Sequence, residues 1–207
     1  MQDVKDKILT RVRAKGRGVV YTTKDFLDLG SRAAVDQALS RLVREKALRR
    51  LRRGLFDYPR VNVKLGGELA ADADSVAQAV ARKVSSRIQP SGALAANVLG
   101  LSTQVPAKRV YLTDGASRKV RVGNQTMVFK HAAPKSLVAT KKASTLVVQA
   151  LRYLGREGVT DEVVRKLRLT LSDQDKKRLV ADTRYAADWI VEAVREIARD
   201  DPPTIQP

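Results

Sequence analysis

The chain has 207 residues, of which 43% are hydrophobic and 4% aromatic, so it can bury a core but offers few rings on which single-stranded nucleic acid could stack. The 40 Lys and Arg side chains outnumber the 22 Asp and Glu, and the net charge of +18 predicts a polyanionic partner. The absence of cysteine and the single histidine exclude disulfides, thiol catalysis and most structural zinc sites.

The sequence predicts a cytoplasmic protein without a membrane partner. No apolar run approaches the roughly 20 residues of a membrane span, and the N-terminal MQDVKDKILTR lacks the apolar segment of a secretory signal. We also expect no cofactor, no metal and no enzymatic activity, because the predicted basic sheet has no carboxylate pair at metal-binding spacing and the sequence has no cysteine or histidine constellation.

The positive charge is concentrated in the first two thirds of the chain. Residues 1–60 hold 16 basic and 7 acidic side chains, residues 61–140 hold 11 and 4, and the remaining residues hold 13 and 11. We therefore expect the contact with the polyanion in the first two segments.

Residues 1–62 have the element order of a winged helix-turn-helix. Apolar residues at helical spacing predict a first helix over residues 3–15, ending at Gly16, and the β-branched VVYT predicts a short strand. A short helix capped by Thr22 or Thr23 and ending at Gly30 comes next, and a third helix begins at Ser31.

The third helix has one apolar face and one basic face. Its apolar side chains are Val35, Ala38, Leu39, Leu42 and Val43. The opposite face carries Gln37, Ser40, Arg41 and Arg44, which could reach base edges in the DNA major groove, while Ser31 and Arg32 at the helix start suit a phosphate.

The segment LRRLRRGLFDYP predicts a β-hairpin with Gly54 at its turn and Pro59 after its second strand. In a winged helix this hairpin is the wing, which touches the phosphate backbone or the minor groove. The wing arginines are Arg49, Arg50, Arg52 and Arg53, and they could neutralise phosphates. The alternative is a solvated basic face on a protein-binding module.

After the hairpin, residues 63–74 are predicted to be a linker, and the C-terminal domain spans 75–207. Its first helix begins with Ser75 as the cap. Three short runs, at 109–113, 118–122 and 126–130, predict a three-stranded antiparallel meander. This sheet is basic, with Lys108, Arg109, Arg118, Lys119 and Arg121 on or beside it.

The last third, residues 143–200, is predicted to be helical. One helix ends at Gly155 or Gly158, a short second helix follows, and a long helix runs from Ser172 to Ala198. Its apolar stripe includes Leu179, Ala186, Trp189, Ile190, Ala193 and Ile197. This stripe is predicted to close the core of the second domain, with a dimer or partner surface as the alternative. The predicted class of the whole chain is α+β.

Two segments of this sequence resemble a known family. ALSRLVREKALRRLRRGLFDYP and AANVLGLSTQVPAKRVYLTDG are similar to the AbiEi-like antitoxins of bacterial type IV toxin–antitoxin systems, and the resemblance runs from about Asp3 to about Pro134. It implies an N-terminal winged helix joined to a C-terminal antitoxin domain. It also implies a nucleotidyltransferase toxin as functional partner, without an obligatory stable complex, and repression of the protein's own operon through inverted repeats in double-stranded promoter DNA.

Carried onto this chain, the resemblance assigns a role to each group of basic residues. DNA reading falls on Ser31, Arg32, Gln37, Ser40, Arg41 and Arg44, and the wing contacts fall on Arg49, Arg50, Arg52 and Arg53. The antitoxic function falls after the linker, where Lys108, Arg109, Arg118, Lys119 and Arg121 form the candidate surface. An RNA-binding accessory protein that uses the basic middle segment, and a stand-alone winged-helix regulator, are the rival hypotheses.

Overall fold

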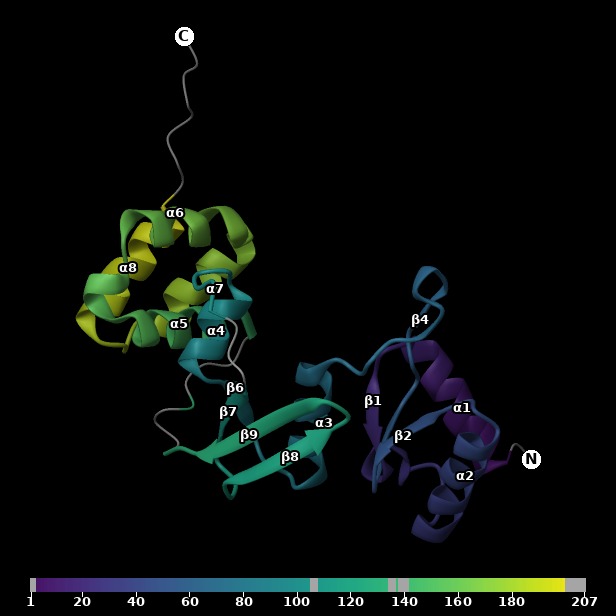
Figure 1. The fold of residues 1–207 in the computed structure, drawn as a ribbon. Coiled ribbons are helices and arrows are strands. Elements are labelled where there is room, and N and C mark those ends of the chain that lie inside the picture. The colour runs from purple at the N-terminus through teal and green to yellow at the C-terminus, as the bar shows by residue number, and fades with distance from the viewer. Residues whose placement is uncertain (1–2, 105–107, 134–136, 138–141, 200–207) are drawn as a thin grey trace. The chain divides into compact units, whose positions relative to one another are not determined.

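A computed structural model describes residues 3–104, 108–133, 137 and 142–199 of the chain (Figure 1). The chain forms two compact units, Met1–Ile88 with Arg118–Met127, and Gln89–Ser117 with Val128–Pro207. Each unit combines helices with short strands, so the predicted α+β class is confirmed. None of the described helices has both the length and the apolar character that crossing a membrane requires.

The first unit begins with the predicted order of elements. These are α1 (Val4–Lys15), β1 (Val20–Thr22), η1 (Thr23–Phe26), α2 (Arg32–Arg44), β2 (Arg49–Arg52) and β3 (Leu55–Asp57). The strands form an antiparallel sheet in the order β1-β3-β2. The expected second helix is only a 3-10 turn that ends at Phe26. Thr22 caps it, and the Asp25 carboxylate accepts a hydrogen bond from the Thr22 backbone N–H at 2.7 Å.

The core of these elements contains the apolar face that the sequence predicts for α2. Val35, Ala38, Leu39 and Leu42 are buried, and Val43 packs against the same cluster from a partly buried position. The other buried members are Ile8, Val12, Tyr21, Phe26, Leu48 and Phe56. At about 1.5–3 kcal/mol for each large side chain, burial of this set drives the packing of α1 and α2 on the sheet.

The segment expected to be a linker is partly structured. It contains β4 (Val61–Asn62), η2 (Val63–Leu65) and β5 (Gly67–Glu68), and the two strands pair in antiparallel fashion. The next helix, α3 (Ala73–Lys83), begins before Ser75, because the Asp72 side chain caps it and accepts from the Ser75 backbone N–H at 2.8 Å. The prediction that Ser75 is the cap is therefore wrong.

Helix α3 packs against β1 and belongs to the first unit. Its Arg82 guanidinium donates to the Val20 carbonyl oxygen at 2.9 Å. Val76, Ala77 and Val80 on the inner face of α3 are buried. The boundary expected at residues 63–74 therefore falls inside a compact unit.

A four-stranded sheet contains residues of both units, in the order β6-β7-β9-β8. Its strands are β6 (Ile88–Pro90), β7 (Arg109–Thr113), β8 (Arg118–Val122) and β9 (Gln125–His131). The predicted meander is wrong in its order, because β9 lies between β7 and β8. The longest strand takes this central place, where both of its edges are paired, and its Met127 and Phe129 are buried. Phe129 stacks on Tyr111 of β7 with ring centroids 5.8 Å apart.

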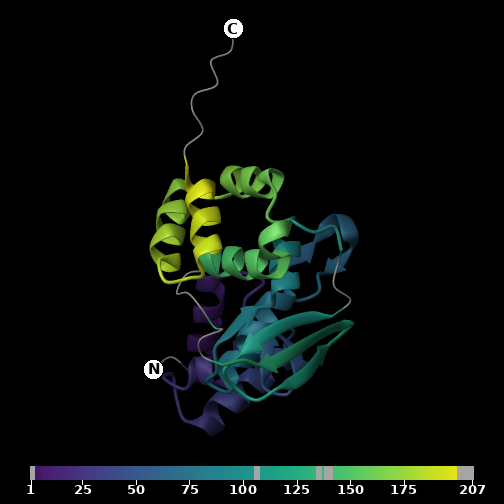
Figure 2. The ribbon, with the colours of Figure 1, turned by 90° about the vertical axis from the view of Figure 1, so that its left-hand side faces the viewer.

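The second unit is mainly helical, and Figure 2 shows its last four helices, in green and yellow, packed together. Its helices are α4 (Gly92–Val98), α5 (Lys142–Gly158), α6 (Asp161–Thr170), α7 (Asp173–Thr183) and α8 (Asp188–Ala198). Helix α5 has a non-helical residue at Gly155, with φ 70°, and ends at Gly158. Asp200, the predicted end of the helical region, lies outside the described residues.

The long helix predicted from Ser172 to Ala198 is two helices. Ser172 caps the first as expected, its Oγ accepting from the Asp175 backbone N–H at 3.2 Å. The break is at Ala187, whose extended backbone, with ψ 144°, forms the cap of α8. The break lets both short helices turn apolar residues inward, and the predicted stripe is core. Leu179, Ile190 and Ile197 are buried, and Ala186, Trp189 and Ala193 pack against them.

The close approach of α4 to α5 leads to a stability prediction. A Cβ atom on Gly92 would lie 2.5 Å from the Tyr153 Cβ and 2.8 Å from the Gln149 carbonyl oxygen. Gly92→Ala should therefore lower the free energy of unfolding by about 1–3 kcal/mol through overpacking, measured by urea denaturation. Gly67→Ala, whose Cβ would have no neighbour within 4 Å, is the control. A stabilised Gly92→Ala protein would show that helix propensity outweighs the clash.

Candidate nucleic-acid interface

The exposed face of α2 carries the side chains that the sequence assigns to nucleic-acid contact. Ser31 caps the helix, its Oγ accepting from the Ala34 backbone N–H at 3.3 Å. Gln37, Arg41 and Arg44 are exposed, and within the described part of the chain their side chains form no hydrogen bond or ion pair. Their donors are therefore available to a ligand.

An acidic residue lies on the same helix and was not among the predicted site residues. The Arg32 Nε donates to the Asp36 carboxylate at 2.8 Å, and both side chains are at least half exposed. This pair uses only the Nε of the guanidinium and leaves the terminal nitrogens of Arg32 free to donate. The spacing of four residues is the signal that could have revealed it.

The arginine-rich hairpin forms around Gly54, as the sequence predicts. Gly54 has φ 72°, a conformation that a residue with a Cβ adopts at a cost. Strand β3 is buried at all three positions, whereas Arg50 and Arg52 of β2 are exposed. Arg53 in the turn is also exposed, so three of the four predicted wing arginines face solvent.

Arg49, the fourth wing arginine, has a different role. Its Nη2 lies 2.6 Å from a carboxylate oxygen of Asp57, which is 1% exposed, and its Nε lies 3.0 Å from the other. The same guanidinium donates to Glu68 at 3.3 Å and to the Leu69 carbonyl at 3.0 Å. These bonds, chiefly those to Asp57, raise the pKa of Arg49 above its usual value. The Arg49 guanidinium therefore bonds to other residues of the protein and has a structural role in the hairpin.

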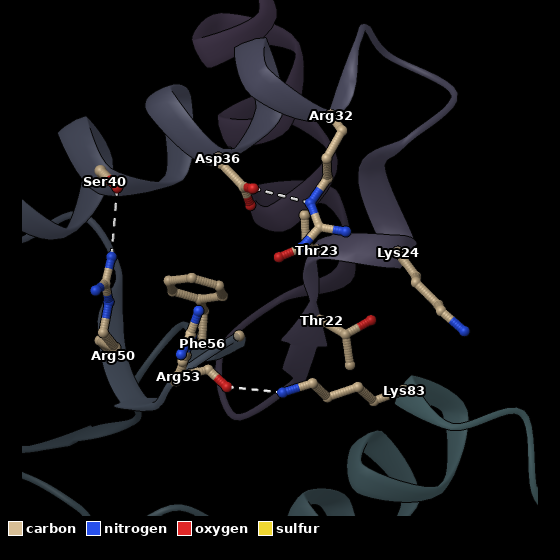
Figure 3. A pocket seen from close by; sticks show the side chains of 11 residues that line it. Thr22, Thr23, Lys24, Arg32, Asp36, Ser40, Arg50, Arg53, Phe56 and Lys83 are labelled. Carbon is tan, nitrogen blue, oxygen red and sulfur yellow. Dashed lines mark hydrogen bonds and ion pairs between the residues drawn. The ribbon is translucent and has the colours of Figure 1, made fainter.

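A basic groove of about 500 Å³ lies between α2 and the hairpin (Figure 3). Arg50 reaches across it toward α2, with Nη2 3.3 Å from the Ser40 Oγ and the guanidinium 5.4 Å from the Phe56 ring centroid. The remaining lining residues are Thr22, Thr23, Lys24, Arg32, Asp36, Arg53, Gly54 and Lys83. The groove therefore joins residues of the two predicted contact regions, the helix face and the wing, in one surface.

The basic residues of the four-stranded sheet are not equivalent. Lys119 and Arg121 alternate with the buried Val120 and Val122 on β8, so the two cations share its exposed side. Arg118 is half-buried, and its Nη2 donates to the Ser86 Oγ at 3.4 Å. The other two predicted surface residues, Lys108 and Arg109, are exposed and belong to the second unit.

These features define an α+β protein whose first unit displays an exposed cationic helix face, an arginine-rich hairpin and a basic groove between them. The chain belongs to DUF6088, a family of unknown function, and the match covers residues 7–179. No curated protein matches the sequence.

The buried ion pair of the hairpin gives the second prediction. Asp57→Asn should lower the free energy of unfolding by about 3 kcal/mol, because it removes the buried counter-charge of the Arg49 guanidinium and leaves only the more distant, exposed Glu68. Urea denaturation followed by circular dichroism measures the change. Arg52→Ala, an exposed site on the neighbouring strand, should stay within about 0.5 kcal/mol of the wild type. Equal stability of Asp57→Asn and the wild type would remove the pair as a determinant of the hairpin.

Proposed function

We propose that this protein is a double-stranded DNA-binding transcriptional repressor that also serves as the antitoxin of a type IV toxin–antitoxin operon. The observation that carries the DNA-binding part is the exposed face of α2, where the donors of Gln37, Arg41 and Arg44 have no partner among the described residues. Beside it stand the exposed arginines of the β2–β3 hairpin.

The chemistry of this surface suits duplex DNA. A helix of this size enters the major groove, where an arginine can donate two hydrogen bonds to guanine and a glutamine can pair with adenine. Arg52 and Arg53 at the hairpin would then lie on backbone phosphates and release counterions. Arg49 is excluded from this set because Asp57 holds it.

The antitoxin part of the proposal rests on the sequence resemblance to AbiEi-like antitoxins. On this proposal the protein represses its own promoter at inverted repeats and counteracts a nucleotidyltransferase toxin without a stable complex. Lys119 and Arg121, which share the exposed side of β8, are the strongest candidates for the antitoxic surface. The same two cations favour a second candidate function, the binding of structured RNA.

A sequence-specificity experiment tests the DNA-binding proposal. The wild-type protein selects its site from a random duplex library, and fluorescence anisotropy then gives the affinities for that site and for mixed-sequence DNA. Gln37→Ala and Arg41→Ala should each cost roughly 1–3 kcal/mol on the selected site and much less on mixed DNA. Equal losses on both DNAs would limit these side chains to phosphate contacts. Preference of the wild type for structured RNA over every duplex would favour the second candidate.

A growth assay tests the division between repression and antitoxic activity. The full chain is expressed beside the nucleotidyltransferase encoded in its own operon, and a promoter reporter follows repression. The Gln37→Ala and Arg41→Ala double variant should lose repression yet keep rescue. Lys119→Glu with Arg121→Glu should lose rescue and keep repression, since exposed strand residues can reverse charge without disturbing the core. Rescue that survives both reversals would place the antitoxic surface elsewhere.

A further inference from the structure

The basic groove of the first unit contains cations from outside the helix face and the hairpin. Lys24 comes from η1, and Lys83 is the last residue of α3 (Figure 3). With Arg32, Arg50 and Arg53 they make five cationic side chains around about 500 Å³, against one carboxylate, Asp36. Such an excess of one sign in one concave surface concentrates the field on a ligand of the opposite sign.

Among the described residues, only one of these five cations has a carboxylate partner. Asp36 pairs with Arg32 alone. The Lys24 Nζ donates to the Ser85 Oγ at 3.3 Å, and the Lys83 Nζ donates to the Arg53 carbonyl at 2.8 Å, so both lysines have neutral partners. Since each ammonium group has three donors, each lysine keeps donors for an anion.

Lys83 also connects α3 to the hairpin tip. Gly54 leaves room for this approach, because a Cβ at that position would lie 3.1 Å from the Lys83 Nζ. The end of α3 and the turn of the hairpin are therefore held together by a side chain that carries a charge. The groove keeps its cations in place through contacts between separate segments of the unit.

We propose that this groove binds the sugar-phosphate backbone of duplex DNA and that Lys24 and Lys83 are phosphate ligands. The inference deepens the proposed function and rests on it. One wall is α2 and the other is the hairpin, so a strand lying along both must pass the groove. All five cations are exposed along the groove, which suits a row of phosphates, since a duplex presents a negative charge about every 1.7 Å along its axis.

The salt dependence of binding tests this proposal. The logarithm of the affinity for a mixed-sequence duplex is plotted against the logarithm of the salt concentration. Each phosphate contact contributes a slope of about −0.9, so Lys24→Ala with Lys83→Gln should flatten the slope by about 1.8. Lys83→Gln alone should flatten it by about 0.9, because it removes the charge while keeping a polar side chain with N–H donors.

The matched control removes two exposed lysines of the same unit outside the groove, Lys7→Ala with Lys15→Ala, and loses the same net charge. Its slope should equal that of the wild type. An unchanged slope in the groove variants, or an equal change in the control, would overturn the groove as a phosphate site while leaving the proposed DNA binding intact. Failure of the wild type to bind any duplex would instead overturn the proposed function. A slope change confined to structured RNA would assign the groove to RNA.

Discussion

The ion pair between Arg49 and Asp57 is the interaction on which the candidate interface depends. Asp57 is 1% exposed on the central strand of its sheet, where an uncompensated carboxylate would be costly. Arg49 compensates it and fixes the pairing of β2 with β3 at that point. The same guanidinium bonds to Glu68 and to the Leu69 carbonyl, so it also ties the β4–β5 ribbon to the hairpin. The position of Arg50 over Phe56 follows from this register.

The cationic side chains of the first unit fall into two groups, those paired with carboxylates of the unit and those without such a partner. Some cations form ion pairs within the unit. The Arg11 Nη2 lies 2.5 Å from a carboxylate oxygen of Asp28, and Arg49 pairs with Asp57. Others, such as Arg41 and Arg53, have no anionic partner among the described residues. Mutual repulsion among the unpaired cations opposes folding, and a polyanion would relieve it. A polyanion that bound only the folded state would therefore stabilise this unit.

Local patterns in the sequence predict much of this unit. The helical period of α2 identifies both its buried and its exposed face, and Gly54 between two arginine pairs identifies the hairpin turn. The role of Arg49 could not be predicted, because all four wing arginines look alike until the tertiary structure brings Asp57 and Glu68 to one of them. Lys83 was missed for the same reason, since thirty residues separate it from the Arg53 carbonyl that it contacts.

The predictions for the strand order, the start of α3 and the break between α7 and α8 were wrong for a related reason. The residue pattern predicts strands at β7, β8 and β9 but not their order, because buried residues alternate with less buried ones in all three. Likewise, Asp72 and Ser75 are both good helix caps, and only the hydrogen bond between them shows which one is used. The break at Ala187 has no glycine or proline to mark it, and packing of α7 and α8 decides it.

The two strands of the hairpin differ in how freely their sequences can change. Strand β3 is buried at Leu55, Phe56 and Asp57, and nearly every substitution there would alter packing or the ion pair. On β2 and in the turn, Arg50, Arg52 and Arg53 are exposed. Relatives could therefore exchange these three side chains and acquire new ligand preferences on an unchanged backbone. The hairpin thus combines a buried strand, on which the core depends, with exposed side chains on which the core does not depend.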